Sequence, residues 1–115
     1  MTFVREVSMQ HPSLFLILAQ LRKYVEQCYG DQLKHLILFG SQARNEATCS
    51  SDIDVMLVLE RVENASLEYD QISKFVAEIC LEHDVLISCV LIHDDVFQTR
   101  ATPLLINVRR EGIAA

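Results

Sequence analysis

Glycine is scarce in this sequence, and no long hydrophobic run is present. Only Gly30, Gly40 and Gly112 occur in 115 residues, so neither a P-loop nor a glycine-rich dinucleotide-binding turn can be built. No apolar run reaches the roughly 18 residues that a transmembrane helix needs. Arg5 and Glu6 interrupt the beginning of the chain, where a signal peptide would need an apolar stretch. We therefore expect no membrane span and no signal peptide.

Positive charge is also limited. The chain has 10 Lys and Arg against 16 Asp and Glu, which gives a formal net charge of −6. A nucleic-acid-binding face needs clustered basic side chains to neutralise phosphates. The composition therefore argues against nucleic acid as a partner and against a template-reading polymerase.

The four cysteines lack the spacing of a metal site or of a redox motif. They stand at positions 28, 49, 80 and 89, far apart from one another. Cys28, Cys80 and Cys89 have apolar neighbours and are predicted to be buried thiols, whereas Cys49 lies in a polar segment. We expect a reduced protein located in the cytoplasm.

Half of the residues are hydrophobic, and they follow strand and helix patterns. The length fits a single domain, residues 1–115, with one core. Short apolar runs bounded by polar residues predict strands, and apolar residues three and four apart predict helices. The predicted strands cover residues 33–39, 53–59 and 85–92, and the predicted helices cover residues 12–29, 42–47, 67–83 and 103–111, with a short turn at 94–97.

The most informative stretch joins the first two predicted strands. Gly40 and Ser41 end the first strand, and after ten intervening residues Asp52-Ile53-Asp54 opens the second. Residues two apart in a strand share a face, so both carboxylates project to one side. A cation stabilises such a pair, and hard oxygen ligands favour Mg²⁺ or Mn²⁺. Gly40 permits a close approach of the backbone to a ligand, and Ser41 can cap a helix whose N-terminus attracts anions. The pattern therefore suits a metal–triphosphate complex.

This pattern resembles the signature of the DNA polymerase β-like nucleotidyltransferases. The longer strings from Leu38 to Arg44 and from Ser51 to Asp54 are similar to the minimal nucleotidyltransferases, the small partners of HEPN-type proteins. Residues 102–112 are similar, more weakly, to the closing helix of many small members. The resemblance implies an α+β nucleotidyltransferase fold, with a small mixed, mainly antiparallel sheet and helices packed on one face.

The resemblance also implies an activity and a site. The activity is Mg²⁺-dependent transfer of a nucleoside monophosphate from a nucleoside triphosphate, with ATP as the expected substrate, to a hydroxyl on a partner protein or a small molecule. Asp52 and Asp54 would be the catalytic, metal-binding residues, and Gly40, Ser41 and Arg44 would contact the nucleotide. A salt bridge to a nearby acidic residue is the alternative role of Arg44.

Two positions depart from the family pattern. Asn45 stands where members usually have Gly, and Ser88 stands where fully active members place a third carboxylate. A serine hydroxyl is a poor general base, because it holds its proton too tightly. A second hypothesis is therefore a non-catalytic, antitoxin-like subunit that neutralises a HEPN-type partner by contact. A plain dimerising domain is a third, and a partner or a second copy is expected to complete the site of so short a chain.

Overall fold

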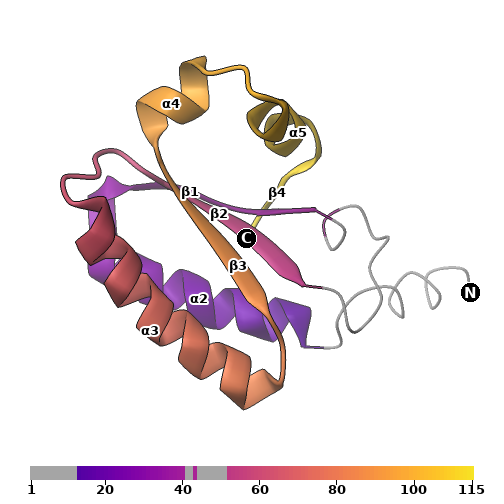
Figure 1. The fold of residues 1–115 in the computed structure, drawn as a ribbon. Helices are drawn as coiled ribbons and strands as arrows, with labels where there is room; N and C mark the ends of the chain where they lie inside the picture. Colours follow the sequence, from indigo (N-terminus) through magenta and orange to yellow (C-terminus); the bar gives the residue numbers. More distant parts are fainter. Residues whose placement is uncertain (1–12, 41–42, 44–51) are drawn as a thin grey trace, which may run out of the picture.

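A computed structural model of the chain describes residues 13–40, 43 and 52–115 (Figure 1). In chain order, the described elements are α2 (Leu14–Tyr29), the 3₁₀ turn η1 (Gly30–Gln32), β1 (Leu33–Phe39), β2 (Ile53–Leu59), α3 (Ala65–His83), β3 (Ile87–His93), α4 (Asp94–Thr99), α5 (Pro103–Glu111) and β4 (Ile113–Ala114). The helix predicted at 42–47 lies outside the described residues except for Ala43. Within this description, no helix is both long and apolar enough to cross a membrane.

The strands of the described part form one mixed sheet in the order β3-β2-β1-β4. β1 is antiparallel to both β2 and β4, whereas β2 is parallel to β3. This confirms the predicted α+β fold with a small, mixed and mainly antiparallel sheet. In the central strand β2 every residue is buried except Asp54, which is half-buried.

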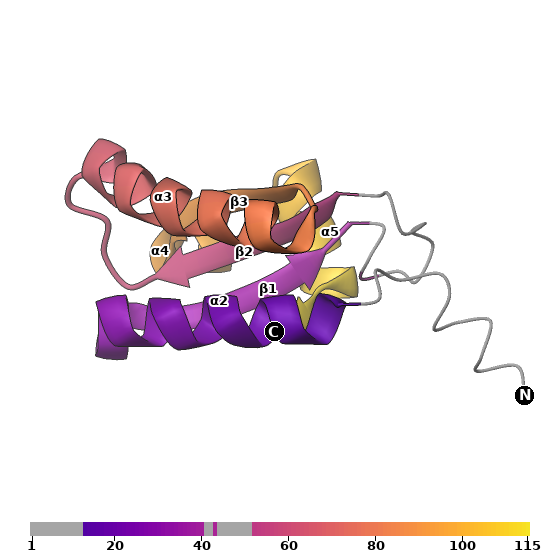
Figure 2. The same cartoon turned by 90° about the horizontal axis from the view of Figure 1, so that it is seen from below.

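The two long helices pack on one face of the sheet (Figures 1 and 2). Alternate residues of β2 face them, and the shared core is made by Leu14, Ile17, Leu18, Leu21, Val25, Leu36, Leu38, Ile53, Val55, Leu57, Leu59, Ile72, Val76 and Ile79. Local signals mark the ends of both helices. Gly30 follows α2 with φ 52°, and Asn64 caps α3 by accepting a hydrogen bond from Leu67 N at 3.2 Å. The helices are also joined to each other, because His83 Nε2 lies 2.9 Å from Gln20 Oε1.

The prediction of helices on one face holds for the two long helices, whereas the short helices α4 and α5 lie over part of the opposite face. A second core cluster joins them to the sheet, with the buried residues Ile37, Met56, Val58, Phe97, Leu105 and Val108. Arg109 of α5 connects the two helices, since its guanidinium donates to Phe97 O and, at 2.8 Å, to Arg100 O. Arg109 stands in the last turn of α5, where a cation suits the helix dipole. In the structure it ties α5 to the end of α4.

The strand β4 was not predicted. Ile113 pairs with Leu38 and Ala114 pairs with Ile37, and Ala115 N donates to Leu36 O at 2.8 Å. Two residues carry no periodic signal, so this strand exists only because α5 delivers the chain to the free edge of β1.

The prediction for the cysteines is wrong at one position. Cys28 is exposed, whereas Cys80 and Cys89 are partly buried. Cys28 lies one helical turn after Tyr24, whose ring stacks on Phe75 at 3.9 Å on the outer side of the groove between α2 and α3. Cys28 therefore lies in the groove between the two long helices and not against the sheet. Cys49 lies outside the described residues.

Candidate functional site

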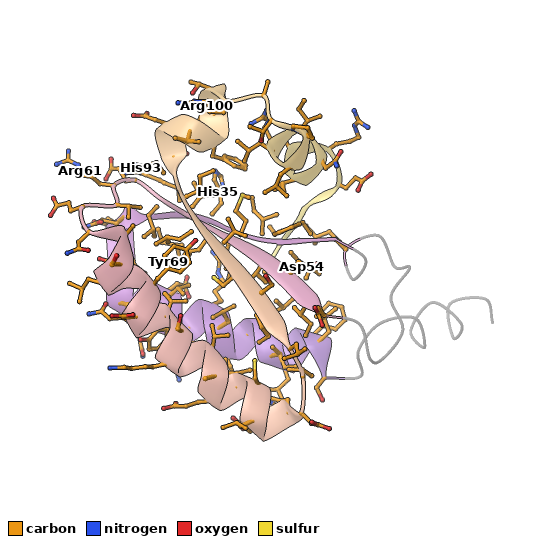
Figure 3. All side chains as sticks on the ribbon, viewed as in Figure 1. His35, Asp54, Arg61, Tyr69, His93 and Arg100 are labelled. Carbon is orange, nitrogen blue, oxygen red and sulfur yellow. The ribbon has the colours of Figure 1, made fainter. Side chains whose placement is uncertain are left out.

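Asp54 lies at the accessible end of the sheet face that carries α4 and α5 (Figure 3). Because residues alternate along a strand, it shares this face with Met56 and Val58. Those two are fully buried, but Asp54 is half-buried. Its neighbours across the sheet are the half-buried Phe39 on β1 and the exposed Ser88 on β3. This face of β2 is therefore covered at Met56 and Val58 and is accessible at Asp54, where the strand begins.

Gly40 lies directly against the Asp54 carboxylate. It follows β1 with φ 77°, a left-handed conformation that side chains disfavour. A Cβ added at this position would lie 3.3 Å from Asp54 Cγ and closer still to Oδ2. Close backbone approach at Gly40 was predicted from the sequence, although the group approached in the structure is the carboxylate.

Asp52 is exposed and immediately precedes β2. The next peptide N–H, that of Ile53, donates to Leu86 O at 2.9 Å, which ties the beginning of β2 to the segment before β3. Strand alternation places the Asp52 side chain on the same side as that of Asp54. The role of Leu86 was not anticipated, because a contact through a main-chain carbonyl leaves no signal in the residue type.

Ser88 is paired with Asp54 in the register of β2 and β3. This is the position that the sequence assigned to the third carboxylate of fully active family members. Among the residues that the structure describes, no group of three or more His, Cys, Asp or Glu is placed to hold a metal ion. The described donors are two carboxylates and one hydroxyl. They fit Mg²⁺, which commonly takes one or two carboxylates and completes its shell with water and substrate phosphates.

The two other residues predicted to contact the nucleotide are Ser41 and Arg44. Both lie outside the described residues. Their roles stay predictions, and the described site consists of Gly40, Asp52 and Asp54, with Ser88 beside them.

A sequence model of the nucleotidyltransferase domain family matches residues 18–104, more than half of the chain. The chain belongs to the nucleotidyltransferase domain family. The matched range includes β1, β2 and β3 and every described residue of the candidate site.

Individual relatives of this nucleotidyltransferase-family chain are distant. A Methanocaldococcus jannaschii protein that bears the provisional name of protein adenylyltransferase is 31% identical over 75 residues, which cover 65% of this chain and 75% of the relative. A solved structure from Sulfolobus solfataricus, provisionally named a nucleotidyltransferase, has a TM-score of 0.61 at 15% identity and covers 95% of this chain and 80% of that one. A toxin–antitoxin structure with AMP-PNP has a TM-score of 0.57 at 16% identity, with coverages of 83% and 69%. A tri-AMPylated Shewanella oneidensis HEPN toxin in complex with its MNT antitoxin has a TM-score of 0.50 at 15% identity, with coverages of 85% and 70%. At these identities the solved structures establish the fold.

A separate apolar cavity of about 510 Å³ lies between α2 and β4. Leu38 lines it, and Leu38 belongs to the core on the α2 side of the sheet, opposite the face of Asp54. The candidate site is therefore distinct from this cavity.

Proposed function

We propose that this chain transfers an adenylyl group from ATP to a hydroxyl on a partner protein, in a Mg²⁺-dependent reaction. The observation that carries the proposal is the placement of Asp54. It is the one residue of the central strand that is not buried, it lies against Gly40, and it stands two residues after the exposed Asp52. The provisional name of the M. jannaschii relative and the AMPylated toxin of the related complex support a protein acceptor. The partner class that we propose is a helical HEPN-type protein.

Each residue has a defined task in this proposal. Asp52 and Asp54 hold the metal, which supplies positive charge to the triphosphate when it is bound. Gly40 and Ser41 offer backbone N–H groups to the phosphates, and Arg44 adds positive charge next to them. The acceptor oxygen forms a bond to the α-phosphorus while the bond from that phosphorus to the β-bridging oxygen breaks. Pyrophosphate leaves with the bonding electrons, and the hydroxyl proton passes to water.

The test is incubation of the chain with the product of its neighbouring gene, ATP and Mg²⁺, followed by intact-mass analysis of both proteins. We expect the partner to gain adenylyl groups with the native chain and to gain none with Asp52→Asn or Asp54→Asn. Each substitution removes a charged oxygen ligand and should weaken Mg²⁺-dependent nucleotide binding. Folding should be intact or slightly improved, because repulsion between like charges is relieved. Unchanged Mg²⁺-dependent binding in both variants would exclude the metal site.

Ser88 favours a second candidate function, that of a non-catalytic subunit which neutralises a HEPN-type partner by contact. A hydroxyl beside Asp54 cannot replace a carboxylate as a general base. This candidate predicts that Asp54→Asn protects cells from the partner as well as the native chain does. The transfer reaction predicts loss of protection, with the complex still formed.

A further inference from the structure

β4 leaves one edge of the sheet open within the described part of the chain (Figure 1). It pairs with β1 on its inner side only, through Ile113 and Ala114. Ala115 N donates inward to Leu36 O, and the main-chain groups of successive residues in a strand point to opposite sides. The N–H and C=O of Ala114 therefore point outward, and neither has a hydrogen bond among the described residues. This edge can accept a further strand.

The apolar cavity of about 510 Å³ lies next to this edge, on the α2 side of the sheet. Its walls are the first turns of α2, the end of β1 and β4, and among the described lining residues Arg22 alone is charged. Arg22 is already engaged, since its Nε lies 3.5 Å from Glu26 Oε2 and its guanidinium donates to Ala115 O. On the two walls Phe15 is 76% exposed and Ile113 is 46% exposed. The cavity therefore suits apolar side chains rather than a charged ligand.

The segment that leads into α2 supplies such side chains. Residues 1–12 lie outside the described residues, and they join α2 through Ser13, directly before two lining residues of the cavity. Their sequence contains the apolar residues Phe3, Val4 and Val7. Residues four apart in an extended segment share a face, so Phe3 and Val7 would project together and Val4 to the other side. One face of an extended segment would therefore carry two apolar side chains for the cavity.

The segment is long enough to reach β4. The cavity-lining residues of α2 run from Leu14 to Arg22, about 12 Å along the helix. Residues 8–12, when extended, span up to about 17 Å, so they can connect Ser13 to a strand at residues 3–7 beside β4. The short tether also gives the segment a local concentration in the millimolar range, which favours it over a second copy of the chain at micromolar protein.

We propose that residues 3–7 bind along the outer edge of β4, with Phe3 and Val7 in the cavity between α2 and β4. Main-chain hydrogen bonds to the open edge and burial of the two side chains stabilise this arrangement. The inference goes beyond the proposed function and does not depend on it. Leu38 lines the cavity two residues before Gly40, so the bound segment becomes part of the packing behind the strand end that leads to the candidate site.

The first experiment detects the contact in the full chain by NMR. We expect nuclear Overhauser effects between the ring protons of Phe3 and the methyl groups of Leu18 and Ile113, which lie on the two walls of the cavity. A mixture of differently labelled chains separates contacts within one chain from contacts between chains. Contacts within one chain support the proposal. Contacts only between chains would assign the edge to a second copy, and the absence of any contact would leave the cavity open; either result overturns the proposal.

The second experiment compares Val7→Ser with Val4→Ser, which remove the same side chain from opposite faces of the segment. Both positions lie outside the two core clusters of the described residues, so the domain should stay folded. We expect Val7→Ser to speed amide exchange at Ala114 by about tenfold, because the buried valine contributes to docking, and Val4→Ser to change it little. Phe3→Ser should have a larger effect than Val7→Ser. Equal exchange at Ala114 in the Val4 and Val7 variants would overturn the proposal.

Discussion

Replacing Ser88 by Asp would put a third carboxylate beside Asp54. The two residues are paired in parallel strands, and such strands lie about 4.8 Å apart, so the charges would be separated by roughly 5 Å. Two unit charges at that distance repel by about 1 kcal/mol in water and by about 3 kcal/mol at an effective dielectric constant of 20. Ser88 is exposed and Asp54 is half-buried, so we expect Ser88→Asp to lower the free energy of unfolding by about 1–2 kcal/mol when no divalent cation is present. Mg²⁺ between the carboxylates should remove this loss or reverse it.

The assay is urea denaturation with a chelator and again with Mg²⁺. Ser88→Asn is the matched control, because it adds a side chain of similar size without charge. The transfer rate is measured in parallel, since one catalytic base typically contributes about 10²–10⁴-fold and even a tenfold gain would be informative. The reasoning is refuted if Asp and Asn at position 88 destabilise equally in both conditions. That result would mean that the side chain is restricted by packing and does not face the metal-binding carboxylates.

Three further predictions address the backbone at Gly40, the partly buried thiol of Cys89 and the connection between α4 and α5. Gly40→Ala should lower the free energy of unfolding by at least about 1–2 kcal/mol, because φ 77° disfavours a side chain. Thermal unfolding should show this loss, and Mg²⁺-dependent nucleotide binding should weaken because the added Cβ displaces the Asp54 carboxylate. Normal nucleotide binding would contradict the contact between Gly40 and Asp54. Burial raises the pKa of the Cys89 thiol from 9.0 to about 11, so the fold favours the neutral form. The contribution of the neutral Cys89 thiol to the free energy of unfolding is complete below about pH 9 and should fall by up to about 2–3 kcal/mol as the pH rises to about 11. Urea denaturation curves of Cys89→Ala should lack this part of the pH dependence. Arg109→Ala should cost about 1–3 kcal/mol, because two charge-assisted hydrogen bonds to main-chain carbonyls are lost, whereas Arg110→Ala at an exposed position should change stability by no more than about 0.5 kcal/mol.

The three long strands could be predicted because each is a short apolar run whose residues must be buried. β1 and β2 are short apolar runs between polar boundaries, and burial on the sheet is the only environment that accommodates them. The position of Ser88 beside Asp54 was predicted from the resemblance to the family, because β3 carries apolar residues on both faces and its pattern alone does not fix the register. The role of Gly40 could also be predicted, because a glycine directly after a strand permits a close approach of a neighbouring group.

The features that were missed depend on parts of the chain that meet only after folding. β4 is two residues long and is defined by its pairing with β1. The role of Arg109 depends on where α4 ends relative to α5, which no periodicity encodes. Cys28 continues the apolar spacing of α2, yet it is exposed in a groove that Tyr24 and residues of α3 also line. The local sequence pattern predicted the helices and strands. The pairing of β4, the role of Arg109 and the exposure of Cys28 depend on contacts between these elements.

The central position of β2 has a consequence for how this protein tolerates change. The strand that begins beside Asp52 and carries Asp54 is also hydrogen-bonded on both sides and buried on both faces. Its amides should be among the slowest to exchange in the molecule, because they open only when the whole sheet opens. Substitutions within residues 55–59 will therefore reduce the amount of folded protein before they alter any chemistry. Substitutions of Asp52 or Asp54 spare the core, so a lineage could lose metal binding while keeping a stable scaffold whose surfaces still bind a partner.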